Sequence, residues 1–179
     1  MSATPVLLID QTQTPIGLTH LISDEQGALR AVFWDDYLPR LEALLTQWFP
    51  RGYRLQSARD HAGFTSALNA YMDGELSALD NLRVKTSGTP FQEIVWRALR
   101  QIPVGTAISY GELARRIGNA SASRAVGLAN GANPVGIVIP CHRVIGANRA
   151  LTGYGGGLHR KRWLLEHEGC NLQLRLTGT

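Results

Sequence analysis

The chain is poor in cysteine and in metal-ligand pairs. Its 179 residues contain two cysteines, Cys141 and Cys170, which are too few for a disulfide framework. In a reducing compartment we expect both to remain thiols, although a single bridge between them is compatible with the sequence. No CxxC or HxxxH pair occurs, and Cys141 and His142 are adjacent in what reads as extended chain, where they would point to opposite sides. We therefore expect no metal site.

Long apolar runs are also missing. No stretch approaches the roughly 20 apolar residues that a bilayer-spanning helix needs. The N-terminus lacks the basic start, apolar core and small-residue cleavage site of a secretory signal. A composition of 44% hydrophobic and 18% charged residues is typical of a folded, soluble protein. We expect a cytoplasmic protein with no membrane partner.

Lysine is scarce, and the basic charge is unevenly distributed. Of the 18 basic residues only Lys85 and Lys161 are lysines. Residues 1–89 carry seven basic and ten acidic side chains, a balance of −3, whereas residues 90–179 carry eleven and four, a balance of +7. An arginine-rich basic half favours a nucleic-acid surface there. A solvated arginine-rich surface without a partner would explain the same charges.

Hydrophobic patterning predicts a two-domain protein of the α+β or α/β class. In the N-terminal half we expect strands over residues 5–10, 16–23 and 28–34 and helices over residues 38–48 and 62–72. This half has no cluster of catalytic residue types, so we interpret residues 1–88 as a mixed α/β scaffold domain. Residues 86–89 are typical of a linker and helix start, and residues 89–179 form the second domain.

Four helices are predicted in the second domain, over residues 90–102, 109–118, 123–131 and 159–168. Thr89 and Ser109 are good N-cap residues, Glu112 stands at a capping-box position, and Gly169 ends the last helix. The two short helices at 109–118 and 123–131, with a turn between them, form a helix-turn-helix candidate.

Two glycines share a face of the helix at 123–131 with Arg124. Gly127 and Gly131 lie three and seven residues further on, and each costs about 1 kcal/mol relative to alanine in a helix. Tight helix packing is one explanation. We favour the other, in which a nucleic-acid backbone approaches closely and Arg124 is the only long side chain that projects.

A cysteine followed by a histidine lies at the end of an apolar run. Residues 135–139, between Pro134 and Pro140, predict a short buried strand with Cys141 at its mouth. A thiol there becomes a nucleophile only if a base removes its proton. His142 could do so, directly or through a water, if Glu168 lies behind it and orients the imidazole.

A glycine-rich loop follows the cysteine. Residues 153–157 read GYGGG and could present backbone N–H groups to a ligand. The loop matches neither a P-loop nor a dinucleotide-binding motif. An ordinary turn would have the same composition.

Six ordered motifs between residues 90 and 170 resemble the O6-alkylguanine-DNA alkyltransferase family. They are SYG at 109–111, SRAVG at 123–127, NP at 133–134, PCHRV at 140–144, YGGG at 154–157 and WLLEHEG at 163–169. The N-terminal half resembles the family more loosely, in length and in strand–helix pattern. The resemblance implies an RNase H-like N-terminal domain and a winged-helix-like C-terminal domain.

The resemblance also implies direct repair of DNA. O6-alkylguanine, or O4-alkylthymine, in duplex DNA would be flipped out of the helix, and its alkyl group would pass to Cys141 in one irreversible step. The helix-turn-helix would enter the minor groove, with Arg124 filling the vacated place in the stack. We expect a monomer that acts once, without cofactor or zinc.

Family similarity assigns roles to further residues. His142 and Glu168 would relay the proton, and Asn133 would brace the recognition helix against the active-site strand. Tyr110 would crowd the phosphate and protonate the leaving base. The Gly155 N–H would bind the guanine O6, and the Cys141 and Val144 carbonyls its exocyclic amine. The remaining residues expected to bind DNA or substrate are Gly131, Tyr154 and Lys161.

Two other classes compete with this interpretation. Some relatives of the family bind alkylated DNA without repairing it, but their cysteine is replaced. A cysteine hydrolase could use the same Cys-His-Glu grouping on an acyl substrate, although it would need an oxyanion hole. The helix-turn-helix argues against a hydrolase.

Overall fold

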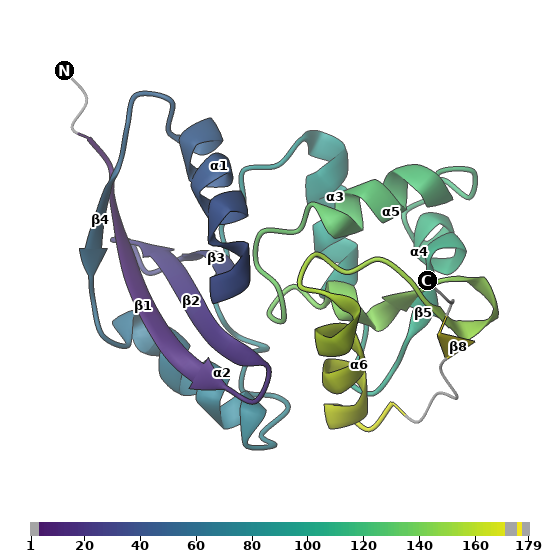
Figure 1. Cartoon of the computed structure of the whole chain (residues 1–179). Coiled ribbons are helices and arrows are strands. Elements are labelled where there is room, and N and C mark those ends of the chain that lie inside the picture. Colours follow the sequence, from purple (N-terminus) through teal and green to yellow (C-terminus); the bar gives the residue numbers. More distant parts are fainter. Residues whose placement is uncertain (1–3, 171–174, 177–179) are drawn as a thin grey trace. The chain divides into compact units, whose positions relative to one another are not determined.

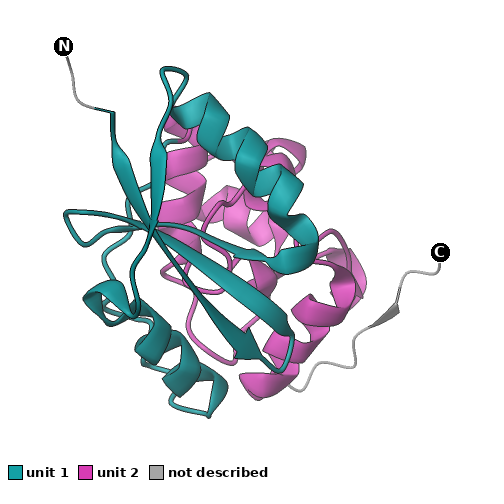
Figure 2. Ribbon diagram, turned by 60° about the vertical axis from the view of Figure 1, so that its left-hand side comes forward, with its two compact units in different colours: residues 1–87 teal, residues 88–179 magenta. Residues whose placement is uncertain are grey.

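The computed structural model describes residues 4–170 and 175–176, so the expected domains extend at both termini beyond the described residues. The chain divides into two compact units, Met1–Ser87 and Gly88–Thr179 (Figure 2). Within the described residues, no helix is long and apolar enough to cross a bilayer.

The first unit is built on a four-stranded sheet in the order β3-β2-β1-β4 (Figure 1). Strands β1 (Val6–Thr14), β2 (Gly17–Asp24) and β3 (Leu29–Trp34) form an antiparallel meander, and β4 (Arg54–Ser57) pairs with β1 in parallel. Helices α1 (Leu38–Trp48) and α2 (Phe64–Met72) complete the unit.

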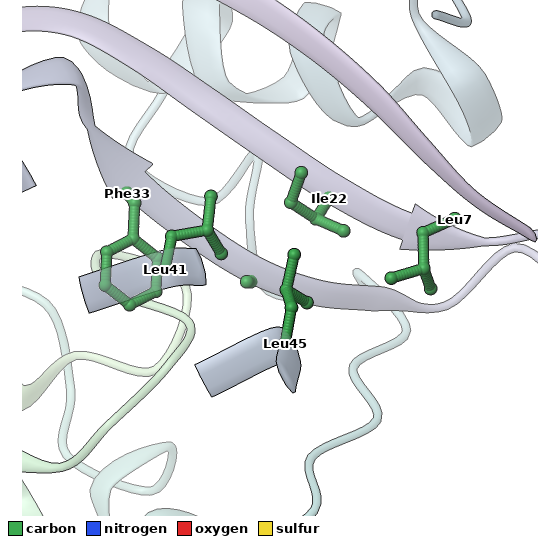
Figure 3. Close-up of a cluster of buried hydrophobic side chains, with 6 residues drawn as sticks. Leu7, Ile22, Phe33, Leu41 and Leu45 are labelled. Carbon is green, nitrogen blue, oxygen red and sulfur yellow. The ribbon is translucent and has the colours of Figure 1, made fainter. Parts of the chain in front are cut away.

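The two helices cover opposite faces of this sheet. Leu7 of β1 packs with Leu41 and Leu45 of α1 in an apolar cluster (Figure 3). Thr12, five residues along the same strand, donates a hydrogen bond to the side chain of Asn69 in α2. Because side chains alternate along a strand, odd and even positions of β1 serve different helices.

The sequence predicted most of this unit. The predicted bounds of α1 are confirmed, and the three meander strands lie where they were expected, although β1 continues four residues further. Strand β4 was missed. All four of its side chains are exposed, so it has no apolar alternation from which a strand could be predicted.

The second unit is mostly helical. Its helices are α3 (Pro90–Leu99), α4 (Tyr110–Arg116), α5 (Ser123–Gly131) and α6 (Leu158–His167). Two short parallel pairs join β5 (Ile108–Ser109) to β6 (Val144–Ile145) and β7 (Ala150–Leu151) to β8 (Arg175–Leu176). Helix α5 packs against both α3 and α4 (Figure 1).

The predicted caps of these helices are present. Thr89 and Gln92 form a complete capping box at the start of α3. The Ser109 hydroxyl accepts a hydrogen bond from the Glu112 N–H, whereas the Glu112 carboxylate binds two arginines of α4 instead of closing the box. Gly169 follows α6 with a left-handed φ of 74°.

Gly88, in the predicted linker and helix start, packs closely against the helix that follows it. A Cβ atom on it would lie 2.4 Å from the Trp96 ring, and its N–H donates to the Glu93 carboxylate. The Trp96 indole in turn donates to the Ala129 carbonyl oxygen at 2.8 Å, which joins α3 to α5. Gly88 thus lets the chain pass close to the tryptophan that connects two helices.

The predicted strand at residues 135–139 is wrong. Its side chains are buried as expected, but the segment is a series of turns in which Ile137 has a left-handed φ of 70°. Pro134 and Pro140 have no N–H to donate to a neighbouring strand. The segment instead forms hydrogen bonds within itself, such as the one from the Ile139 N–H to the Val135 carbonyl oxygen. Apolar runs of this length do not distinguish a buried strand from a buried turn.

Candidate active site

Cys141 begins a short 3₁₀ turn, Cys141–Arg143, instead of ending a strand. The cysteine is 6% exposed, and its sulfur accepts a hydrogen bond from the Asn133 Nδ2 at 3.0 Å. A donor aimed at the sulfur stabilises a thiolate more than a thiol. The geometry at this atom therefore favours a nucleophilic cysteine.

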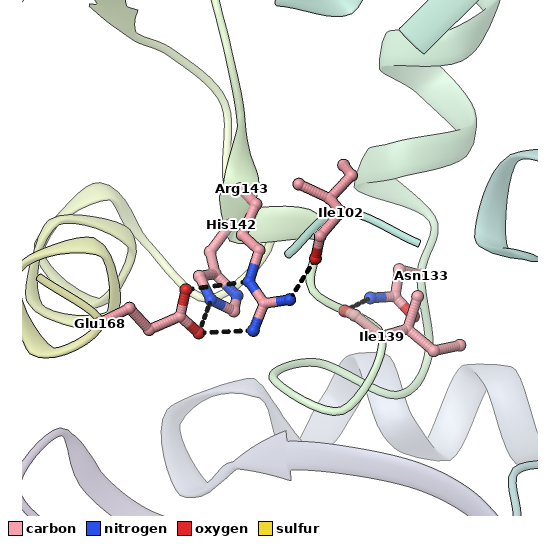
Figure 4. A network of polar contacts seen from close by, with 6 residues as sticks. All are labelled: Ile102, Asn133, Ile139, His142, Arg143 and Glu168. Carbon is pink, nitrogen blue, oxygen red and sulfur yellow. Dashed lines mark hydrogen bonds and ion pairs between the residues drawn. The ribbon is translucent and has the colours of Figure 1, made fainter. Parts of the chain in front are cut away.

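Asn133 holds the turns that precede the cysteine. Its Nδ2 also donates to the Ile139 carbonyl oxygen at 2.8 Å (Figure 4). Its Oδ1 accepts from the Val135 N–H at 2.9 Å. One amide thus spans the segment that contains the left-handed Ile137. Such a conformation is uncommon for a β-branched residue and persists only where its surroundings enforce it.

His142 and Arg143 share one buried carboxylate. The Glu168 side chain lies 2.9 Å from the His142 Nε2 and accepts two hydrogen bonds from the Arg143 guanidinium, each 2.9 Å (Figure 4). Arg143 also donates to the Ile102 carbonyl oxygen. The structure therefore brings the predicted His142 and Glu168 together, with Arg143 as a third member.

The electrostatics of this group favour an ionised Glu168 beside a neutral His142. Burial raises the pKa of Glu168, but the bonds from His142 and Arg143 outweigh burial and hold it far below its usual range. Burial lowers the pKa of His142, and the partly opposing effect of Glu168 does not restore it. With Nε2–H donated to Glu168, the lone pair resides on Nδ1, which has no hydrogen-bond partner among the described residues.

Lys161 lies inside the unit and not on its surface. It is completely buried, and its Nζ donates to the carbonyl oxygens of Thr152 at 2.7 Å and Gly153 at 3.3 Å. Burial lowers its pKa to about 8, while the nearby Cys141 opposes the shift. The Tyr110 hydroxyl donates to the same Thr152 oxygen at 3.4 Å. Lys161 therefore fixes the start of the glycine-rich loop through hydrogen bonds to its backbone.

Helix α6 holds the other end of this loop as well. The Arg160 guanidinium donates to the Gly156 carbonyl oxygen at 2.8 Å, and the Gly157 N–H closes a turn onto the Tyr154 oxygen. Gly155, between these points, is half-buried, and its N–H donates to no group in the part of the chain that the structure describes. Hydrogen bonds thus fix both ends of the loop, while the Gly155 N–H in its middle is available to donate to a ligand.

The exposed face of α5 differs from the expectation. Arg124 is exposed, but so is Leu128, at 74%, so Arg124 is not the only long side chain that projects. A Cβ atom on Gly127 would lie 3.8 Å from the Tyr110 ring, in ordinary contact, whereas one on Gly131 would meet nothing within 4 Å. Gly127 therefore lies against α4, and only Gly131 is on the open face.

Arg143 and Asn130 also belong to this site, although neither was predicted from the sequence. Asn130 is 2% exposed and donates to the Cys141 carbonyl oxygen at 3.3 Å. Its position four residues after the buried Val126 placed it on the buried face of α5, where a polar side chain needs a partner. Arg143 gave no such signal, because its partners are 41 and 25 residues away.

The described residues contain no group of three or more His, Cys, Asp or Glu side chains that could hold a metal ion. Cys141 and Cys170 are both buried thiols. Cys170 packs in an apolar cluster with Ile145, Leu151 and Leu165.

Comparisons with known proteins agree with one another. Residues 90–170 match the family model described as the DNA-binding domain of 6-O-methylguanine DNA methyltransferase. A methylated-DNA–protein-cysteine methyltransferase of Salmonella typhimurium is 50% identical over 164 residues, which are 91% of this chain and 96% of the relative. One from Mycobacterium bovis is 54% identical over 116 residues, 65% of this chain and 70% of the relative.

Solved structures share the fold. The crystal structure of O6-methylguanine methyltransferase from Mycobacterium tuberculosis matches with a TM-score of 0.75 and 39% identity, and covers 96% of this chain and 98% of that one. The same organism's protein in complex with DNA matches with a TM-score of 0.73 and 39% identity, over 91% and 92% of the two chains. The mixed α/β fold is thus that of known relatives, and the chain belongs to the methylated-DNA–protein-cysteine methyltransferase family.

Proposed function

We propose that this protein repairs alkylated DNA by transferring the alkyl group of O6-alkylguanine, or of O4-alkylthymine, in duplex DNA to the Cys141 sulfur. It is a methyltransferase that binds DNA and acts on it. The observation that carries the assignment is a buried thiol, held by Asn133, directly before a histidine whose tautomer a buried carboxylate fixes. Each molecule acts once and requires no cofactor.

The proton of the thiol leaves through His142. The Nδ1 lone pair takes it, directly or through a water, while Glu168 stabilises the imidazolium. The thiolate then attacks the sp³ carbon of the alkyl group, a C–S bond forms, and the C–O bond breaks with its electrons passing to O6. Tyr110 returns a proton to the departing base. Burial raises the pKa of the Tyr110 hydroxyl, so it holds its proton at neutral pH and releases it only to a strong base such as the guanine anion formed when the C–O bond breaks.

The flipped base is recognised by backbone groups. The Gly155 N–H binds O6, and the Val144 carbonyl accepts from the exocyclic amine, with Tyr154 beside the base. The Cys141 carbonyl already accepts hydrogen bonds from the Val144 N–H and from Asn130. A guanine amine reaches that oxygen only if it replaces the long bond from Asn130. Lys161 positions this loop and, as a cation near Cys141, stabilises the thiolate, rather than contacting DNA.

The DNA is held by residues 89–179, and residues 1–88 act as a scaffold. We assign the first domain to an RNase H-like class and the second to a winged-helix-like class. Helices α4 and α5 form the helix-turn-helix that enters the minor groove, and Gly131 lies on its open face. Arg124 replaces the extruded base. The balance of +7 in residues 90–179 supports this placement. The protein acts as a monomer in the cytoplasm.

Intact mass after mixing with a duplex that contains O6-methylguanine tests the proposal. One methyl adduct per protein, located on Cys141 and missing in Cys141→Ala, is expected, because a thioether does not hydrolyse. Binding without an adduct would leave a DNA-binding protein. Repeated turnover on an ester or amide would indicate a hydrolase.

A further inference from the structure

We propose that Leu128 is a second DNA-contacting residue of α5, which packs its apolar side chain into the minor groove one helical turn from Arg124. The inference rests on the proposed function, because it assumes that α5 lies in that groove. It adds a contact whose strength does not depend on salt.

The burial pattern of α5 separates two faces. Val126, Ala129 and Asn130 are buried against the rest of the unit. The opposite face consists of the exposed residues Arg124, Ala125, Leu128 and Gly131. Leu128 is therefore the only large apolar side chain on that face, and small residues flank it.

Among the residues whose burial the structure describes, Leu128 is far more exposed than the other large apolar side chains. Its exposed fraction is 74%, compared with 47% for Leu55, 42% for Ile94 and 37% for Leu158. Covering such a side chain removes apolar surface from water, which is favourable in proportion to the area covered. One leucine among small residues is too small a patch for a protein–protein interface, which usually exceeds about 1,000 Å². A narrow groove suits a single projecting side chain better.

The chemistry of the minor groove fits leucine. Proteins that bind there frequently insert apolar wedges such as leucine between base steps, together with arginines that enter the same groove. Leu128 and Arg124 lie four residues apart on one face, so they are about 6 Å apart along the helix axis, or about two base-pair steps. Leucine makes no hydrogen bond to a base edge. It therefore favours no sequence, as a protein that must act on lesions in any context requires.

The test compares Leu128→Asn and Leu128→Ala with wild type on two substrates. Asparagine keeps the approximate size and removes the apolar surface. With duplex O6-methylguanine DNA, we expect both variants to bind and react more weakly by roughly tenfold to a hundredfold. With the free base O6-methylguanine, the rate should stay at the wild-type value. The slope of log Kd against log salt should not change, because an apolar contact neutralises no phosphate and releases no counterion.

Ile94→Asn, on the exposed part of α3, is the matched control and should leave both reactions unchanged. A wild-type protein that forms no adduct with the duplex would remove the proposed function itself. If the wild-type protein reacts with the duplex and Leu128→Asn reacts equally fast, only the role of Leu128 is overturned. So would a dimer that Leu128→Asn dissociates without loss of duplex repair, since Leu128 would then contact a second copy.

Discussion

Cys141 and Cys170 are both buried, yet their surroundings give them different chemistry. The Cys141 sulfur accepts a hydrogen bond from Asn133 and lies near the Lys161 cation. Cys170 lies among apolar side chains, and burial, followed by the charge of Glu168, raises its pKa. Because the thiolate is the nucleophile, only Cys141 is prepared to react.

Replacement of Cys170 by alanine should therefore leave repair intact. We expect one adduct per molecule and a transfer rate within about twofold of wild type, because its thiol contributes packing alone. Intact mass and peptide mapping check this result. A second adduct in wild type that disappears in Cys170→Ala would contradict it.

Lys161→Met tests the support of the glycine-rich loop. The variant keeps an unbranched chain but removes the donor to Thr152 and Gly153 and the charge near Cys141. We expect the transfer rate to fall by about tenfold or more with both duplex and free base, because loss of a charged hydrogen bond inside a protein costs about 1.5–3 kcal/mol. Arg162→Met, one position along α6, is the control and should react normally. A loss confined to duplex DNA would instead indicate a direct DNA contact.

The C-terminus of α6 carries a negative charge, which is unfavourable for an isolated helix. Glu168 caps the C-terminus of the helix, where the macrodipole disfavours a carboxylate. His142 and Arg143 offset that cost and fasten the helix to the turn of Cys141. The carboxylate of the proposed proton relay thus also attaches α6 to the turn of Cys141.

Acid should weaken this attachment. The folded-state pKa of Glu168 lies far below the ordinary value of 4.5, so its contribution to stability is complete above about pH 4.5 and is lost as pH falls. At pH 7 Glu168→Gln should lower the free energy of unfolding by about 3–5 kcal/mol, because it leaves Arg143 buried without its anion. Urea denaturation should show a constant difference between pH 7 and about pH 5, and a difference that shrinks as pH falls further, from about pH 5 to pH 3. The exposed Glu166→Gln is the control, and a constant difference would refute the assignment.

Gly88→Ala tests the packing that joins α3 to α5. The added methyl group would collide with the Trp96 ring, and we expect a loss of about 1–3 kcal/mol in thermal or urea unfolding. Gly131→Ala places the same methyl group where nothing lies within 4 Å. It should be neutral or stabilise by up to about 1 kcal/mol. Equal effects of the two changes would rule out the contact with Trp96.

Elements defined by local signals were predictable from the sequence. The caps Thr89 and Ser109 located two helices, because a cap acts on its own helix. Strand β4 and the turns at 135–139 depend on what the rest of the chain places beside them, and both were misjudged. The same distinction applies to the site. Motifs identified Cys141 and His142, whereas the shared use of Glu168 by Arg143 exists only after distant segments meet.

For the molecule as a whole, repair should reduce stability. The Cys141 sulfur is buried, with Asn133 Nδ2 3.0 Å away, so a methyl group on it has little room. Overfilling such a site costs about 1–3 kcal/mol of folding free energy. In a domain of roughly 60–100 residues, such as the second unit, each kcal/mol lowers the midpoint of thermal unfolding by about 4–8 °C. Calorimetry before and after stoichiometric methylation should show a lower midpoint. Cys141→Ala treated identically should not change, and an unchanged or higher midpoint in methylated wild type would contradict the expectation.

The shared carboxylate also affects how natural variation in this family can be interpreted. In the proposed mechanism Glu168 acts on the chemistry through His142, and it also holds the fold through Arg143, so a substitution there should alter both properties. A variant library sorted by protein abundance would lose Glu168 variants before their reactivity was measured. An alignment that showed Glu168 to be invariant would likewise not reveal whether selection for reactivity or selection for stability maintains it. Arg143, which makes no proposed contact with DNA or the transferred group, would look as constrained as a catalytic residue.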